Sequence, residues 1–242
     1  MNEAPTWEIK SLHQIELTSH CNLRCVYCTS PNLKRPKLDM DEKTFDRALA
    51  WVKYYVDLGT QGELNMAEIG ESTMHPLLPE YLMRARAVIG NQRRLCFATN
   101  GILVTEELAK KIAPAQPSIW VSLHRPEKAK HAVDILREYG LLVGVSTSPA
   151  LDAVDWARQV DWEVTSKMFG DACDWRRNGW VEVMADGRLT TCCFDSDGSG
   201  VIGHIDQEPG SVVSKPYRLC KDCHLDVGIE GWRDRVEGRV RV

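Results

Sequence analysis

The chain has 242 residues, of which 43% are hydrophobic and 26% charged, and its formal net charge is −4. This length and composition predict one compact domain, or a domain with a small appendage, with enough apolar side chains for a sizeable core. The mild acidity excludes the strong basic excess that non-specific nucleic-acid binding requires, so a nucleic acid stays open as a partner but is not favoured.

No stretch of the sequence predicts a membrane span or a signal peptide. The longest apolar runs, such as residues 141–145, are far shorter than a membrane-spanning helix, and the polar start MNEAPTWEIK lacks a basic and an apolar region. We expect a soluble protein of the cytoplasm with no membrane partner. A reducing compartment and the odd number of nine cysteines argue against a disulfide framework, so metal binding is the leading explanation for them.

Strands and helices are predicted to alternate from residue 13 onward. The strands are expected at residues 13–17, 63–69, 93–99, 118–124 and 141–147, with a sixth at 162–166. The helices that follow the first five strands are expected at residues 41–59, 78–88, 106–112, 128–139 and 151–159. Repeated βα units of this kind predict an α/β fold, a partial (β/α)6 TIM-like barrel, whose active groups lie on the loops after the carboxyl ends of the strands.

The pattern changes after about residue 169. The segment WVEVMADGRLTTCC, residues 180–193, contains two short strands around Asp186-Gly187. This pair predicts a tight hairpin turn, because glycine accepts the positive φ that such a turn requires. A small C-terminal module with a hairpin and a helix is expected here, which divides the chain into residues 1–168 and 169–242.

Three cysteines are crowded into the loop after the first predicted strand. Cys21, Cys25 and Cys28 stand at the spacing Cys-x₃-Cys-x₂-Cys. Thiolates bind zinc or iron–sulfur clusters, and a closed zinc site takes four protein ligands, so zinc would need a fourth ligand such as His13 or His20. The alternative is a [4Fe–4S] cluster whose fourth iron stays open for a small molecule.

The cysteine spacing on this loop, with aromatic Tyr27 before the last cysteine, resembles the radical S-adenosylmethionine (SAM) superfamily. The resemblance implies that Cys21, Cys25 and Cys28 hold a [4Fe–4S] cluster, that its open iron binds SAM, and that Tyr27 lies near the adenine. It also implies an enzyme that reductively cleaves SAM to a 5′-deoxyadenosyl radical, which abstracts hydrogen from a substrate. The electron would come from a donor such as flavodoxin or ferredoxin.

Further motifs agree with this resemblance. The stretch EIGESTMHP resembles the family's Gly-Gly-Glu-Pro motif and implies that Gly70 and Glu71 meet the SAM ammonium group, although an ordinary turn is the alternative. Asn100 in FATNG and Ser122 in VSLH end the third and fourth strands, where relatives place SAM-binding groups. His124 is a candidate acid or base, with a purely structural role as the alternative.

Four later cysteines form a second constellation. Cys173, Cys192, Cys220 and Cys223 would satisfy zinc as a ribbon, since four thiolates complete a tetrahedral site. Their spacing also resembles the twitch domain, the short form of the SPASM extension of radical SAM enzymes, which implies an auxiliary [4Fe–4S] cluster and hence two clusters in all. Cys192 and adjacent Cys193 point to opposite faces of a strand, and the family spacing favours Cys192 as the ligand.

The resemblance implies oxidation or rearrangement of a small substrate, assisted by the auxiliary cluster. Arg176 and Arg177, beside Cys173, are candidates to hold a substrate carboxylate or phosphate, with plain surface charge as the alternative. Modification of a nucleoside, a nucleobase or a ribosomal peptide by the same radical start stays open. So does a non-catalytic zinc or iron–sulfur protein.

Overall fold

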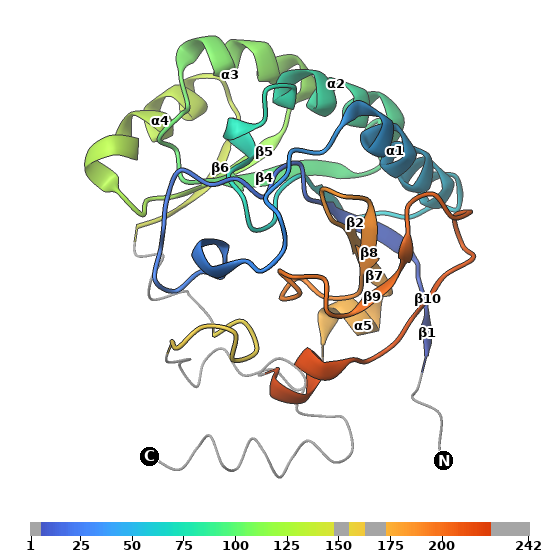
Figure 1. Cartoon of the computed structure of the whole chain (residues 1–242). Helices are drawn as coiled ribbons and strands as arrows, with labels where there is room; N and C mark the ends of the chain where they lie inside the picture. Colours follow the sequence, from blue (N-terminus) through green and yellow to red (C-terminus); the bar gives the residue numbers. More distant parts are fainter. Residues whose placement is uncertain (1–5, 148–154, 163–172, 224–242) are drawn as a thin grey trace.

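The computed structural model describes residues 6–147, 155–162 and 173–223. Its centre is a sheet of eight described strands (Figure 1). In order across the sheet, these are β6 (Leu142–Ser146), β5 (Ser118–Ser122), β4 (Arg94–Thr99), β3 (Glu63–Asn65), β2 (Ser11–Ile15), β7 (Trp180–Val183), β8 (Arg188–Thr190) and β9 (Val201–His204). The six strands from β6 to β7 run parallel to one another, whereas β8 is antiparallel to β7 and β9 is antiparallel to β8.

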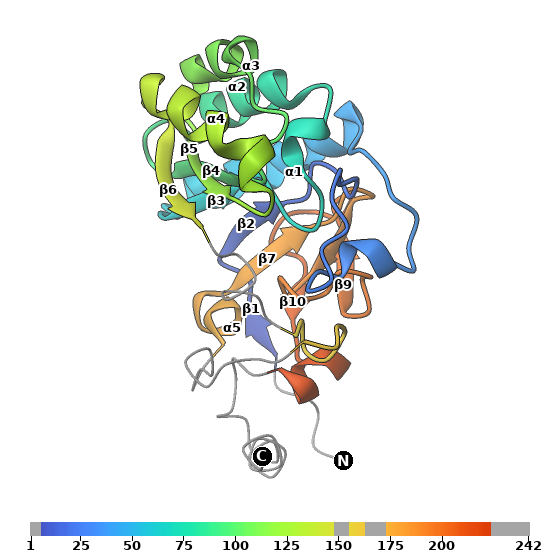
Figure 2. The ribbon, with the colours of Figure 1, turned by 90° about the vertical axis from the view of Figure 1, so that its left-hand side faces the viewer.

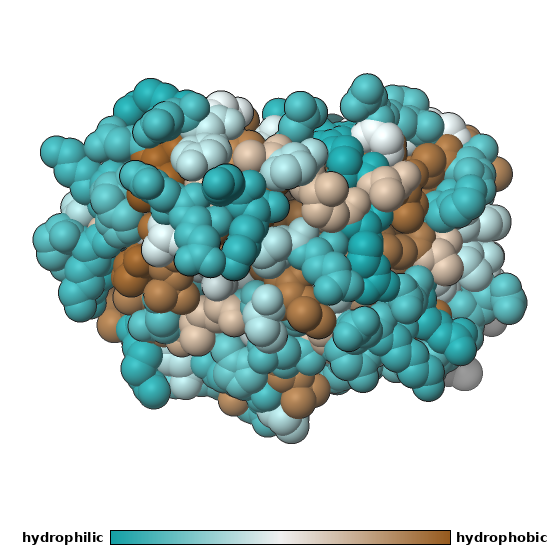
Figure 3. All heavy atoms as spheres, turned by 90° about the horizontal axis from the view of Figure 1, so that it is seen from above, coloured by the Kyte–Doolittle hydropathy of each residue, from teal (hydrophilic) through white to brown (hydrophobic). Residues whose placement is uncertain are grey.

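Helices follow four of the parallel strands and cover one face of the sheet (Figures 1 and 2). They are α1 (Glu42–Asp57), α2 (Leu78–Ile89), α3 (Glu106–Ile112) and α4 (Pro126–Glu138). Two begin at side chains that cap the first turn, since Asp41 accepts a hydrogen bond from the N–H of Thr44 (2.7 Å) and Thr105 one from the N–H of Leu108 (3.1 Å). The apolar side chains of these helices pack on the sheet, and the opposite surface is largely hydrophilic in the view from above (Figure 3).

The α/β class and the mostly parallel sheet are confirmed, and the first five predicted strands lie within a few residues of their expected positions. The expected sixth strand, apart from Trp162, lies outside the described residues. The helix expected at residues 151–159 is wrong where it can be compared. Residues 156–159 form a turn, and Trp156, Ala157 and Arg158 have φ values of 52°, 55° and 64°, which a right-handed helix excludes.

The predicted hairpin is present, but it belongs to the same sheet as the βα units. β7 and β8 pair around Gly187, whose φ is 86°, and β7 also pairs in parallel with β2 through Ser11–Trp180 and Ile15–Val183. β2 is therefore an interior strand of the sheet. The division of the chain at residue 168 stays a prediction, and strands from both sides of that residue belong to one continuous sheet.

Smaller elements complete the described part of the chain. β1 (Trp7–Glu8) pairs with β10 (Val213–Ser214), and α5 (Asp174–Asn178) directly precedes β7. Trp51 of α1 donates its indole N–H to the backbone oxygens of Ile205 and Gln207, both at 3.1 Å, which ties the segment after β9 to the helical layer. Within the described residues, no helix is long and apolar enough to span a membrane.

Candidate functional site

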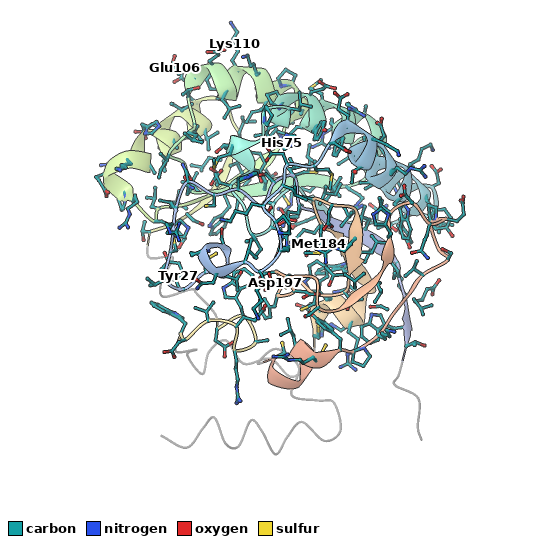
Figure 4. All side chains as sticks on the ribbon, viewed as in Figure 1. Tyr27, His75, Glu106, Lys110, Met184 and Asp197 are labelled. Carbon is teal, nitrogen blue, oxygen red and sulfur yellow. The ribbon has the colours of Figure 1, made fainter. Side chains whose placement is uncertain are left out.

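A cavity of about 600 Å³ opens at the carboxyl ends of the parallel strands. It is lined by the loop after β2, the segment after β3, and the ends of β4, β5 and β6. The structure brings together here every residue that the sequence predicted for the first cluster and SAM, and also the candidate acid or base: Cys21, Cys25, Cys28, Tyr27, Gly70, Glu71, Asn100, Ser122 and His124. The outer side chains Glu106 and Lys110 of α3 point away from this end, whereas Tyr27 lies on the cysteine loop (Figure 4).

The cysteine loop is held against the segment after β3 by a close backbone approach at Gly70. A Cβ atom on Gly70 would stand 2.0 Å from the backbone oxygen of Thr18 and 2.8 Å from that of His20. The N–H of the next residue, Glu71, donates to the same His20 oxygen at 2.8 Å. Only glycine fits there, so Gly70 positions the cysteines through the main chain.

Glu71 connects the segment after β3 to the end of β4 and, through Asn100, to the cysteine loop. Its Oε1 accepts hydrogen bonds from Thr73, through the backbone N–H (3.1 Å) and the hydroxyl (2.6 Å), and from the hydroxyl of Thr99 (2.7 Å). Its Oε2 accepts the backbone N–H of Asn100 at 2.7 Å. A carboxylate oxygen has about two lone pairs, so Oε1 is saturated and Oε2 keeps one acceptor position for a ligand. Asn100 in turn donates its amide to Asn22 of the cysteine loop at 2.6 Å.

His124 and Tyr27 form a hydrogen-bonded pair beside the cysteines. The Tyr27 hydroxyl lies 2.6 Å from Nδ1 of His124, and the Cys25 sulfur lies 3.8 Å from the same nitrogen. Burial, with the nearby charge of Arg125, lowers the pKa of His124, and burial raises the pKa of Tyr27 to about 12. Both are therefore neutral near pH 7.

Neither histidine considered as a fourth zinc ligand lies with the three cysteines. His13 stacks on Trp180, with ring centroids 3.9 Å apart, and meets the edge of Trp175 at 5.5 Å. His20 turns toward Asp39, whose Oδ1 is 3.0 Å from Nδ1. Neither residue lines the cavity.

The first cavity offers three thiols as metal ligands. In the described part of the chain, no group of three or more His, Cys, Asp or Glu side chains is close enough to share one metal ion. A cubane cluster binds each thiolate through a different iron. Burial raises the pKa of Cys21 and of Cys28, so loading a metal must displace their protons.

The four later cysteines also meet, around a second and smaller cavity. Its lining contains Cys173, Cys192, Cys220 and Cys223 but not Cys193. A hydrogen bond from Cys193 lowers the pKa of Cys192, whose sulfur also accepts the N–H of Phe194 at 3.3 Å. The hydrogen bond to Cys192 and burial raise the pKa of Cys193, which lies near the carboxyl groups of the sheet interior. The expectation that both cysteines lie on a strand is wrong, because β8 ends at Thr190 and Cys193 lies in a turn. Of the two adjacent thiols, only Cys192 lines the smaller cavity.

The two arginines proposed for a substrate anion do not reach the first cavity. Arg176 lines the smaller cavity, whereas Arg177 pairs with Asp174 and has a side chain that is 64% exposed. They are therefore not brought beside the predicted SAM site.

Several residues of the first cavity were missed in the sequence. They are Glu68, Trp120, Ser146 and Trp156, together with the small and apolar residues between them. Trp120 could have been predicted from the sequence, since it stands two residues before Ser122 on β5 and so points to the same face of the sheet. Its ring packs over Gly144, where a Cβ atom would lie 2.2 Å from the nearest ring carbon.

Comparison with solved structures identifies the same fold. The structure matches BtrN in complex with AdoMet and 2-DOIA with a TM-score of 0.67 at 20% identity, over 82% of this chain and 79% of that one. It matches anSMEcpe with bound AdoMet with a TM-score of 0.59 at 14% identity, over 81% and 75%.

Two curated proteins match part of the sequence. One is the tungsten-containing aldehyde ferredoxin oxidoreductase cofactor-modifying protein of Pyrococcus furiosus, 32% identical over 99 residues, which are 41% of this chain and 26% of that protein. The other is GTP 3′,8-cyclase of Chlorobaculum tepidum, 26% identical over 117 residues, which are 48% and 34%. The matched segments therefore span only about a quarter and a third of these relatives.

The family model decides the assignment. The model of the radical SAM superfamily matches residues 15–171, from the end of β2 past β6, and so includes the cysteine loop and the strand ends that line the first cavity. Members of this superfamily are iron–sulfur enzymes that use a [4Fe–4S] cluster and SAM. Because the match covers well over half of the sequence, the chain belongs to the radical SAM superfamily.

Proposed function

We propose that Cys21, Cys25 and Cys28 bind the family's [4Fe–4S] cluster and that SAM binds beside it in the first cavity. When bound, these groups supply a 5′-deoxyadenosyl radical that takes a hydrogen atom from a small substrate. The observation that carries the proposal is the convergence of nine separately predicted residues on one cavity at the strand ends. The two solved structures with this fold, BtrN and anSMEcpe, hold AdoMet, which supports SAM as the ligand.

The chain's own groups orient SAM and exclude water from it. Glu71 keeps one acceptor position on Oε2 for the SAM ammonium group, and Ser122 offers a hydroxyl from the end of β5. Tyr27 is fixed by His124 at 2.6 Å and presents its ring to the cavity near the proposed adenine position. Trp120 and Trp156 close part of the wall with apolar surface.

We further propose that Cys173, Cys192, Cys220 and Cys223 bind an auxiliary [4Fe–4S] cluster, and that the net reaction is an oxidation or a rearrangement. The shared lining of the second cavity supports this ligand set. A cluster with four protein ligands has no free iron for SAM, but it can accept an electron from a substrate radical. Flavodoxin or ferredoxin in the cytoplasm is the proposed electron donor.

Anaerobic reconstitution tests both clusters. We expect about eight irons per chain, as two four-iron clusters imply, and release of 5′-deoxyadenosine from SAM after reduction. Cys25→Ala should lose about four irons and all SAM cleavage, whereas Cys220→Ala should lose about four irons and keep uncoupled cleavage.

Cys96 provides the matched control, because it is a half-buried thiol on β4 that lines neither cavity. Cys96→Ser should keep the full iron content and activity. Tightly bound zinc in place of iron, or equal loss of SAM cleavage in Cys25→Ala and Cys220→Ala, would contradict the proposal.

A further inference from the structure

The first cavity is acidic, with no basic side chain to balance it. Its described lining contains two carboxyl groups, Glu68 and Glu71, and three thiols, and none of its lining residues is a lysine or an arginine. The carboxylate of Glu71 is engaged in four hydrogen bonds within the protein, and its remaining acceptor position is the one proposed for the SAM ammonium group. Glu68 is the other carboxyl group of the lining.

Glu68 is attached to a row of polar side chains inside the sheet. Gln14 on β2 is paired in register with Asn65 on β3 and with Glu182 on β7. Its amide nitrogen donates to Oε2 of Glu68 and lies 3.5 Å from Oε2 of Glu182, and its amide oxygen accepts from Asn65 at 3.0 Å. Gln14 therefore has no further donor to offer.

Three carboxyl groups meet here around one guanidinium group. Arg35 donates to Oε1 of Glu16 at 2.5 Å and to the backbone oxygen of Ser196, and the N–H of Ala185 donates to Oε2 of Glu16 at 2.9 Å. Arg35 thus pairs directly with Glu16, and its Nη1 is buried with no hydrogen-bond partner in the described part of the chain. Among the described residues, no cation forms an ion pair with Glu68 or Glu182. Burial raises the pKa of both carboxyl groups well above the ordinary range, and the neighbouring carboxyl groups raise it further.

One oxygen of Glu68 is left over. Its Oε1 is buried and has no hydrogen-bond partner among the described residues. A buried carboxyl oxygen without a donor is unfavourable, and a ligand that donates a hydrogen bond to it would explain why the group is kept here. A ligand with a positive charge would supply the missing donor, and its charge would favour the ionised form of the carboxyl group.

We propose that Glu68 is a substrate-binding residue and that it receives an ammonium group of a positively charged substrate. The inference rests on the proposed function, because it places the substrate beside SAM in the first cavity. Substrates with a carboxylate or a phosphate are disfavoured, since the described lining offers them no cationic group. The ammonium group of SAM could bind Glu68 in the same way, so the experiment must distinguish SAM from the substrate as the ligand of Glu68.

The test uses the reconstituted enzyme with SAM and three probes on one ring: trans-4-aminocyclohexanol, cyclohexane-1,4-diol and 4-hydroxycyclohexanecarboxylate. Dissociation constants are measured by ligand-observed NMR. The wild type should bind the amine more tightly than the diol, and the diol more tightly than the carboxylate. Glu68→Gln should weaken binding of the amine about 10- to 100-fold, as expected for loss of one charged hydrogen bond, and should leave the diol nearly unchanged.

Glu63→Gln is the matched control. Glu63 lies on β3, five residues before Glu68, but it pairs with Arg94 outside the cavity and should not affect any probe. The KM for SAM in uncoupled cleavage should stay within about twofold of wild type in Glu68→Gln, a change below 1 kcal/mol. A rise in that KM as large as the loss of amine binding would assign Glu68 to SAM and overturn the proposal.

The order in which the wild type binds the three probes tests the proposal without any variant. The proposal can therefore be refuted even if Glu68→Gln does not fold. A wild type that forms 5′-deoxyadenosine but binds the carboxylate as well as the amine, or neither of them, overturns the inference alone. A wild type that loads iron but never cleaves SAM overturns the proposed function instead. Equal amine binding by wild type and a folded Glu68→Gln protein also overturns the inference.

Discussion

The Oε2 atom of Glu71 lies 2.7 Å from the backbone nitrogen of Asn100 and accepts its hydrogen bond. This contact joins the segment after β3 to the end of β4. Since Asn100 also bonds to Asn22, the arrangement of the cysteine loop depends on the same carboxylate.

Glu71→Gln tests this dependence. The variant places an amide NH₂ group where a protein donor now points, so we expect a loss of about 1–3 kcal/mol in the free energy of unfolding. We also expect a KM for SAM at least about tenfold higher, because the loops that bind it lose their common acceptor. Urea unfolding and initial rates of SAM cleavage measure the two effects. Glu107→Gln, at an exposed pair with Lys111, is the control, and identical behaviour of both variants would refute the assigned role.

Gly70→Ala should prevent loading of the first cluster. Its Cβ atom would stand 2.0 Å from the Thr18 oxygen, which belongs to the backbone and cannot rotate away. The cysteine loop must therefore shift, and the iron content should fall by about four atoms per chain.

Gly62→Ala separates this clash from backbone strain. Gly62 has a φ of 89°, but a Cβ atom there meets nothing within 4 Å. That variant should lose about 1 kcal/mol of stability and still load fully. Full loading of Gly70→Ala would show that the close approach does not control the loop.

Gly144→Ala should push Trp120 into the first cavity. The new methyl group would lie 2.2 Å from the ring, and Trp120 is 46% exposed, so the ring is free to turn toward the ligand space. We expect ligand binding to weaken about tenfold while the unfolding free energy changes by less than about 1 kcal/mol. The double variant Gly144→Ala, Trp120→Ala should relieve the effect, which binding assays on the four proteins of the cycle will measure. Additive losses in the cycle would argue against this clash.

His13 should make stability depend on pH. Burial lowers its pKa to about 4, compared with an ordinary value near 6.5. Below pH 6.5 the unfolded chain binds a proton that the folded chain does not, so stability falls as the pH drops from about 6.5 to about 4, by at most about 3 kcal/mol. His13→Phe keeps an aromatic ring between Trp175 and Trp180 but removes the titration. Anaerobic urea midpoints at several pH values should show a steeper decline for the wild type, and parallel curves would disprove the assignment.

Much of the βα framework was predictable because its signals are local. Residues 41–59 and 106–112 have apolar spacing and capping residues that specify helices without reference to the rest of the chain. The error at residues 155–159 has a tertiary cause. Trp156 and Ala157 join a small cluster with Phe194 and Leu219, and periodicity in one segment does not reveal such distant partners.

The candidate site shows the same limit. The cysteines could be predicted because metal binding requires thiols at a set spacing. Gly70 could be predicted because the close backbone approach at this position requires glycine. Glu68 could not be predicted, since its surroundings are set by the register of Gln14 with Asn65 and Glu182, three strands that are far apart in the sequence. No pattern around EIGES indicates that its first glutamate lies beside two further carboxyl groups.

The pairing of β2 with β7 also has a consequence for biosynthesis. As the chain leaves the ribosome, Ser11–Ile15 can join β3 early, yet its other edge has no neighbour until Trp180–Val183 has emerged. For the time needed to translate some 165 residues, this strand exposes unpaired amide and carbonyl groups next to the nascent cysteine loop. Cluster delivery before the last quarter of the polypeptide has been made would therefore meet a sheet in which β2 still lacks one of its two neighbours.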